Sequence, residues 1–199
     1  MRQRGFSLVE LMVAIAVLML LMLAAMPGIG TWLDNTRIRN QADSIVGGLQ
    51  AARAEAVRTN QSVSFWLAGS TSTPGALDDT CALSATTASW VVSVTSPANN
   101  CAGWLATTPA LIVSSRAMGE DSGHVSVHAW QSDLATDATS VTFNGFGRIA
   151  NSNPIAQIDL DGLGGKTYRK LRIKISPAGS VRVCDPAVSL ASTDPRKCS

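Results

Sequence analysis

A single carboxylate interrupts a long apolar stretch near the start of the chain. Between Phe6 and Met26 only Ser7 and Glu10 are polar. A carboxylate inside a membrane-spanning helix costs on the order of 2.5–3.5 kcal/mol on insertion scales, so it requires a partner or a function. The residue type and position of Glu10 therefore predict a charge-pairing site within an apolar helix. The alternative is a carboxylate near the membrane surface that simply reaches water.

The segment that holds Glu10 permits three interpretations. A basic start followed by an apolar stretch fits a cleavable secretory signal, but about 21 apolar residues is the length that crosses a bilayer. A plain transmembrane anchor fits that length and leaves Glu10 unexplained. The third interpretation accounts for every residue, because Arg2-Gln3-Arg4-Gly5-Phe6-Ser7-Leu8-Val9-Glu10 resembles the class III leader junction of type IV prepilins and pseudopilins.

That resemblance implies a processed amino terminus. In this family a membrane peptidase cuts after the glycine and methylates the new terminal amine. By resemblance, Gly5 is the last leader residue, Phe6 becomes the methylated first residue and Glu10 becomes the fifth mature residue. The Glu10 carboxylate is then expected to pair with the Phe6 amine of a neighbouring subunit, since two charges that are costly alone become tolerable together. The pair would also fix the axial register between subunits.

The helix is expected to continue beyond the membrane. The run Pro27-Gly28-Ile29-Gly30 predicts a kink or a loosened turn. Six apolar residues then recur at spacings of three and four, which predicts one buried face of an amphipathic helix. They are Ile38, Ala42, Ile45, Leu49, Ala52 and Ala56. Gly47 and Gly48 each weaken the helix by roughly 1 kcal/mol relative to alanine, and the helix is expected to end near Thr59 and Asn60.

The rest of the chain predicts an α+β protein in which the helix packs on an antiparallel sheet. Short β-like runs alternate with turn residues, at Ser62–Leu67, Trp90–Thr95, Leu111–Ser115, Val125–Trp130, Ser140–Asn144, Ile155–Leu160, Leu171–Ser176 and Val181–Cys184. Long loops are expected near 68–88 and 96–109. The predicted organisation, that of the type IV pilin fold, is a leader at 1–5, a transmembrane helix at 6–33, an amphipathic helix at 34–60 and a periplasmic β-rich domain at 61–199.

Four cysteines lie beyond residue 80, in the part that would follow a membrane anchor. An even number there suits disulfides in an oxidising compartment. Of the three possible pairings, Cys81–Cys101 and Cys184–Cys198 are favoured because each brackets a loop rich in Pro, Asn or Ser. A zinc site is the alternative, but the sequence has no C-x2-C spacing.

Three further stretches resemble the GspH/FimT group of pilin-like proteins. They are the helix segment Leu49–Arg58, the β-turn-β segment Val141–Arg148 and the closing segment Ser176–Pro186. The resemblance implies a minor type IV pilin that helps to start or cap a filament at the inner membrane, or alternatively pseudopilin H of type II secretion. The implied partners are other pilin or pseudopilin subunits, the prepilin peptidase, the inner-membrane assembly platform and the inner membrane itself.

The last third of the chain is basic, and this suggests a second kind of partner. Residues 166–199 carry eight Lys or Arg residues against two aspartates, whereas residues 61–165 carry two against eight acids. Some FimT-type pilins bind DNA through a C-terminal Gly-Arg-x-Arg motif, but here Gly179-Ser180-Val181-Arg182 lacks the first arginine. The candidate DNA contacts are Arg169, Lys170, Arg172, Lys174 and Arg182. A solvated sheet face, or steering of contacts between subunits, is the alternative.

No motif for catalysis, a cofactor or a metal is evident. His124 and His128 lie at positions i and i+4, and no third ligand follows at a suitable distance, so surface histidines are expected. The sequence contains no nucleophile elbow, phosphate loop or paired catalytic carboxylates. We therefore expect a structural subunit, not an enzyme, with DNA binding as an added activity to be tested.

Overall fold

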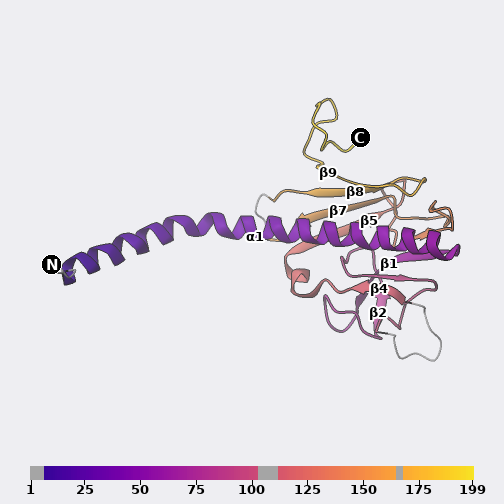
Figure 1. Cartoon of the computed structure of the whole chain (residues 1–199), viewed down its shortest axis with the longest axis horizontal. Coiled ribbons are helices and arrows are strands. Elements are labelled where there is room, and N and C mark those ends of the chain that lie inside the picture. Colours follow the sequence, from indigo (N-terminus) through magenta and orange to yellow (C-terminus); the bar gives the residue numbers. More distant parts are fainter. Residues whose placement is uncertain (1–6, 103–111, 165–167) are drawn as a thin grey trace, which may run out of the picture.

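The chain folds into one long helix and a β-rich domain (Figure 1). The computed structural model describes residues 7–102, 112–164 and 168–199. Helix α1 (Leu8–Thr59) has 52 residues, which span about 78 Å at 1.5 Å per residue. Its N-terminal half extends beyond the domain and curves gently, and the helix continues through 27–30, where the sequence predicts a kink or a loosened turn (Figure 1). Asn60 ends the helix in a left-handed conformation (φ 53°) and donates its N–H to the carbonyl of Ala56, as expected of a C-cap.

Within the described ranges, the named strands all pair in antiparallel fashion. The strands are β1 (Val63–Ser70), β2 (Cys81–Leu83), β3 (Trp90–Ser93), β4 (Ile112–Arg116), β5 (Val125–Trp130), β6 (Ser140–Phe143), β7 (Gln157–Gly162), β8 (Leu171–Ile175) and β9 (Val181–Cys184). A short 3-10 helix (Gly119–Gly123) precedes β5. Each predicted β-run overlaps one of these strands, which confirms the predicted α+β class.

The strands form two sheets where one was expected. The first has the order β2-β1-β3-β4, with β6 also paired to β1, and the second has the order β5-β7-β8-β9. In Figure 1 the two sheets lie on either side of α1, so that the helix covers both. Strand β2 lies inside the stretch predicted to be a loop. Its three residues are too few to show a periodic pattern, and pairing with the end of β1 is what orders them.

The predicted face of the helix forms the centre of the core. Ile38, Ala42, Ile45, Leu49, Ala52 and Ala56 are all completely buried. They belong to one cluster that also contains Phe65 of the first sheet and Leu160 of the second. Each large aliphatic residue contributes roughly 1.5–3 kcal/mol on full burial. This shared core holds the two sheets and the helix together as one unit.

A close approach between α1 and the first sheet explains one of the two helix glycines. A Cβ added at Gly48 would lie 2.8 Å from both the Phe65 and the Trp90 rings. The same two rings pack against each other with centroids 5.9 Å apart, and the Trp90 indole donates a hydrogen bond to Ser44 Oγ (3.0 Å). Gly48 therefore lets two aromatic residues pack against the helix backbone.

Candidate functional site

The N-terminal half of α1 presents apolar side chains to its surroundings. Leu8, Leu11, Met12, Leu18 and Leu20 are between 53% and 74% exposed. No part of the domain covers this segment in Figure 1. No helical stretch among the described residues combines the length and the apolar character that a membrane crossing requires.

Glu10 lies exposed in the first turn of α1. A carboxylate is favourable there because the first turn carries the positive end of the helix dipole. Among the described residues Glu10 has no ion-pair partner. Gly5 and Phe6, the predicted cleavage and methylation residues, lie outside the described part of the chain, so the predicted pairing of Glu10 with a terminal amine stays a prediction.

The predicted basic strand lies beside an acidic one. Lys170 precedes β8, and its Nζ lies 2.7 Å from Asp161 Oδ2 on β7. Arg172 Nε donates to Asp159 Oδ1 at 2.6 Å. The Asp161 carboxylate raises the pKa of the Lys170 ammonium, first through this hydrogen bond and then through its charge. Aspartates of the acidic middle region thus form ion pairs with basic residues of the last third across one sheet. Part of the positive charge of residues 166–199 is therefore neutralised within the chain.

Two other candidate DNA contacts hold the C-terminal loop. Arg169 Nε donates to Asp185 Oδ2 at 3.3 Å. The Arg182 guanidinium donates to the carbonyl oxygens of Pro195 and Lys197, at 2.8 and 3.2 Å. Lys174, the remaining candidate, forms no ion pair within the described ranges. The five residues are therefore near one another on or beside one sheet, and four of them have a structural contact of their own.

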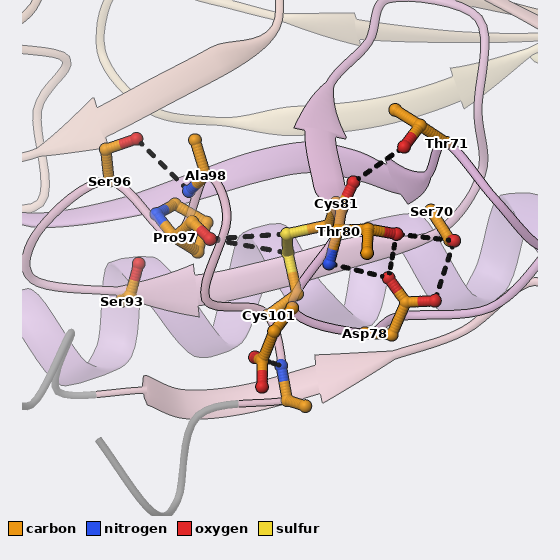
Figure 2. Close-up of a disulfide and its surroundings, with 12 residues drawn as sticks. Ser70, Thr71, Asp78, Thr80, Cys81, Ser93, Ser96, Pro97, Ala98 and Cys101 are labelled. Atoms are coloured by element: carbon orange, nitrogen blue, oxygen red, sulfur yellow. Dashed lines mark hydrogen bonds between the residues drawn. A yellow bond between two sulfur atoms is a disulfide. The ribbon is translucent and has the colours of Figure 1, made fainter.

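Two disulfides close loops of the domain. Cys81 is bonded to Cys101, and Cys184 to Cys198, which are the pairings that the loop compositions favour. Cys81 and Cys101 are buried beside Ala68 and Val91 in a second, smaller core cluster. Figure 2 shows this disulfide beside Pro97, next to a network in which Asp78 accepts hydrogen bonds from Ser70 Oγ (2.7 Å) and Thr80 Oγ1 (2.6 Å).

The two histidines occupy separate environments. His128 Nε2 lies 2.7 Å from Asp137 Oδ1, and its ring stacks on Trp130 with centroids 3.8 Å apart. His124 Nδ1 lies 3.7 Å from Asp34 Oδ1 of the helix. Each histidine therefore has its own carboxylate partner, as surface histidines commonly do.

The fold and the site together define a pilin-like subunit: a long helix with an apolar, exposed N-terminal half, an acid in its first turn, and an antiparallel β-domain packed on its second half. Two family models match the sequence. The model described as type II transport protein GspH matches residues 41–179, and that of the prokaryotic N-terminal methylation motif matches residues 1–26. The chain belongs to the GspH family, a family of structural pilin-like proteins.

Two crystal structures of the type IV minor pilin FimU from Pseudomonas aeruginosa resemble the chain. In one crystal form the identity is 15% and the TM-score 0.44, with 77% of this chain and 98% of FimU covered. In the other the identity is again 15% and the TM-score 0.45, with 81% and 98% covered. No curated protein matches the sequence significantly.

Proposed function

We propose that this protein is a minor type IV pilin, a structural subunit that takes part in starting or capping a filament at the inner membrane. The observation that carries the proposal is the isolated Glu10 in the exposed apolar half of α1, joined to a GspH-type domain. An uncovered apolar helix is stable only in lipid or against other apolar helices. A filament core of pilin helices supplies that environment.

In the proposed assembly step, the Glu10 carboxylate of one subunit pairs with the amine of Phe6 on a neighbour. Glu10 lies four residues past the predicted new terminus, or about 6 Å along a helix, so the carboxylate meets the amine when adjacent parallel helices are offset by about that distance. Pairing removes the cost of burying either charge alone. Prepilin peptidase would create the amine, and the inner-membrane assembly platform would bring the helices together.

The proposed topology places the domain in the periplasm, with residues 6–33 in the inner membrane before assembly. Both disulfides lie on the domain side of the helix, and disulfides persist in an oxidising compartment. This topology is supported by the match to the methylation motif at residues 1–26 and by the basic residues Arg2 and Arg4 ahead of the apolar stretch, which favour a cytoplasmic leader.

Replacement of Glu10 tests the proposal. Glu10→Ala should still be cleaved after Gly5, because the leader junction is intact, but should enter filaments poorly since the neighbour's amine loses its partner. Glu10→Asp is the matched control and should retain part of the incorporation. The readout is the amount of processed subunit in sheared filaments relative to the membrane. Incorporation of Glu10→Ala at the wild-type level would overturn the proposal.

The alternative is a minor pseudopilin H of type II secretion, and the description of the matching family model favours it. Both functions use the same helix and the same Glu10 chemistry, so deletion of the whole protein separates them. Loss of surface pili with normal secretion supports the pilus, whereas accumulation of secreted proteins in the periplasm supports the secretion machine.

DNA binding stays a prediction for this chain. Arg169, Lys170 and Arg172 each pair with an aspartate, so a phosphate must compete with that carboxylate. We expect weak retardation of DNA that disappears as salt is raised, because phosphate contacts release counterions. Lys174→Ala should weaken it more than Lys170→Ala, because Lys174 has no competing ion pair in the described chain. Absence of any shift at low salt would end the hypothesis.

A further inference from the structure

The β-domain contains a cleft at the end where α1 enters it. The cleft lies between α1 and strands β8 and β9 and has a volume of about 500 Å³. The helix lines it with residues between Trp32 and Asp43. Among the described helix residues, Ile38 is the first that is completely buried, so this stretch marks the entry of α1 into the domain. The cleft is therefore the part of the domain nearest to the exposed apolar half of the helix.

The proposed topology places this cleft at the surface of the membrane. Residues 6–33 measure about 42 Å along a helix, which matches a bilayer together with both headgroup layers. Trp32 then lies in the periplasmic headgroup layer, and its side chain is 66% exposed. Tryptophan is enriched at that level because its ring is apolar and its N–H is polar. Arg39 lies about 10 Å beyond Trp32 along the helix, and long helical side chains lean toward the N-terminus, here toward the membrane.

The side chains that line the cleft carry an excess of one positive charge. Arg39, Arg169 and Arg196 lie against Asp43 and Asp185. The Arg39–Asp43 pair is loose, because Arg39 Nε lies 4.0 Å from Asp43 Oδ2 and the two side chains are 75% and 69% exposed. Arg39 can therefore turn from this carboxylate to another anion at little cost.

The other two arginines differ in how many donors they retain. Arg196 donates through Nε and Nη2 to Asp194, at 3.0 and 2.6 Å, so much of its charge is already compensated. Arg169 donates only through Nε to Asp185, at 3.3 Å, and its two Nη nitrogens form no hydrogen bond within the described ranges. Arg39 and Arg169 are therefore the arginines best placed to receive a ligand.

A helix residue fixes the position of Arg169 and adds a donor. The backbone N–H of Arg169 donates to Asn35 Oδ1 at 2.9 Å, which holds the start of β8 against α1. Because the oxygen of the Asn35 amide is used in this way, its NH₂ group is the part that remains for a ligand. Two guanidinium groups and one amide thus surround the cleft, and guanidinium matches the oxygens of a phosphate group in bidentate geometry.

We propose that this cleft is a membrane-docking site, in which Arg39 and Arg169 bind the phosphate of an anionic phospholipid of the periplasmic leaflet while Trp32 lies in the headgroup layer beside it. The inference rests on the proposed function, because the depth of Trp32 follows from the proposed topology. The contact would hold the domain against the membrane before the subunit enters a filament.

The tether to the membrane favours a lipid over an anion from solution. Helix α1 keeps the cleft beside the bilayer, so headgroups are present at a high effective concentration. An excess of one positive charge attracts DNA only weakly, because the affinity for nucleic acid grows with the number of phosphates neutralised. Trp32 also gives a contact at the membrane interface that a free phosphate ion cannot make.

Hydrogen exchange of the full chain in lipid nanodiscs tests the site. The chain is compared in phosphatidylcholine alone and in an equimolar mixture with phosphatidylglycerol. The amides of Arg169 and Lys170, which precede β8, should exchange several-fold more slowly in the mixture. Those of the turn at 144–148 should exchange equally in both. Equal exchange of Arg169 and Lys170 in the two lipids would overturn the inference.

Two substitutions that remove the same charge separate a site from a general charge effect. Arg39→Gln should reduce the phosphatidylglycerol-dependent protection about fivefold, the effect of one basic residue near an anionic surface. Thermal unfolding should not change, because the Arg39 side chain is 75% exposed. Arg148→Gln is the control, because Arg148 is exposed and its turn borders Arg53, about 21 Å along α1 from Arg39. It should keep the full protection, and equal losses in the two variants would contradict a defined site.

Added ligands identify what the cleft binds. In nanodiscs of phosphatidylcholine alone, neither inorganic phosphate nor a short DNA duplex should slow exchange at Arg169 and Lys170. Slowing by phosphate would make the cleft a general anion site, and slowing by DNA would make it a nucleic-acid contact. Either result would overturn the assignment to a lipid.

The same experiment distinguishes this inference from the proposed function. A chain that does not insert into nanodiscs would contradict the proposed topology and the docking site together. A chain that inserts without lipid-dependent protection would overturn the docking site alone. Glu10→Ala, in which the cleft is intact, should show the full protection while entering filaments poorly.

Discussion

Adjacent glycines of α1 lie in opposite environments. A Cβ at Gly47 would meet nothing within 4 Å, whereas one at Gly48 would lie 2.8 Å from the rings of Phe65 and Trp90. Gly47→Ala should therefore stabilise the domain by up to about 1 kcal/mol through helix propensity. Gly48→Ala should destabilise it by roughly 1–3 kcal/mol through overpacking.

Chemical denaturation of the full chain in detergent, followed by tryptophan fluorescence, measures this pair of variants. Each is the control for the other, since both remove one helix glycine and add one methyl group. Equal effects of the two substitutions would show that Gly48 has no packing role.

One carboxylate of the C-terminal loop has a strongly shifted pKa. Asp194 accepts hydrogen bonds from the Arg196 guanidinium at 2.6 and 3.0 Å, and chiefly for this reason its pKa falls from 3.8 to about 2. A lowered pKa means that the folded state binds the proton more weakly. Its contribution to loop stability is therefore complete above pH 3.8 and is lost as the pH falls through about 2.

Carboxyl NMR of the full chain in detergent checks this titration. Asp194 should remain ionised at pH 3, and the protection factors of the loop amides, which correct for the intrinsic pH dependence of exchange, should be unchanged there. In Asp194→Asn these protection factors should be lower at neutral pH, with no further change on acidification over this range. An Asp194 midpoint close to 3.8 would contradict the ion pair as described.

At the scale of elements, the Cys81–Cys101 disulfide links β2 to the loop after β3. It closes a loop with a sequence separation of 20 residues, which contributes roughly 3 kcal/mol in the chain-entropy model. Cys81→Ala with Cys101→Ala should therefore lower the free energy of unfolding by about that amount. The denaturation midpoint measures it, and the wild-type chain under reducing conditions should shift the same way. An unchanged midpoint would show that the surrounding network of Asp78 holds the loop unaided.

Among the elements, the buried face of the helix is predictable from the sequence, whereas the arrangement of the strands is not. The 3-4 spacing from Ile38 to Ala56 predicts a buried face correctly, because helix periodicity is a local property. The split into two sheets is not predictable, because it depends on which strand pairs with which across long separations. Strand β2 has only three residues and exists through its pairing with β1.

At the candidate site, the sequence predicts which face of the strand is basic but not which ion pairs these residues form. Alternation places Lys170, Arg172 and Lys174 on one face, but the pairing of Lys170 with Asp161 and of Arg172 with Asp159 depends on the β7–β8 register. That register aligns Asp159 with Arg172. The predicted run Ser140–Asn144 places Phe143 on a strand and Phe146 in the turn after it, but the degree to which Phe146 is exposed is set by how that turn packs on α1.

At the scale of the whole molecule, the two halves of α1 have different partners. The C-terminal half buries its apolar face under both sheets, so the domain needs no neighbour for its own core. In the N-terminal half, the described side chains from Ser7 to Met22 are all exposed. In the proposed function this exposed apolar segment lies in a membrane or among the helices of other subunits, and Glu10 is the residue proposed to distinguish a polymerising helix from a simple anchor.

Intact-mass spectrometry of the protein isolated from its native membrane tests this claim most directly. We predict a mature chain that begins at Phe6 and carries the mass of one added methyl group on its terminal amine. That terminus places a free amine four residues ahead of Glu10. A chain that still contains residues 1–5 would contradict the account, because no amine would be created four residues ahead of the carboxylate. A chain cleaved beyond Glu10 would also contradict it, because the carboxylate itself would be removed.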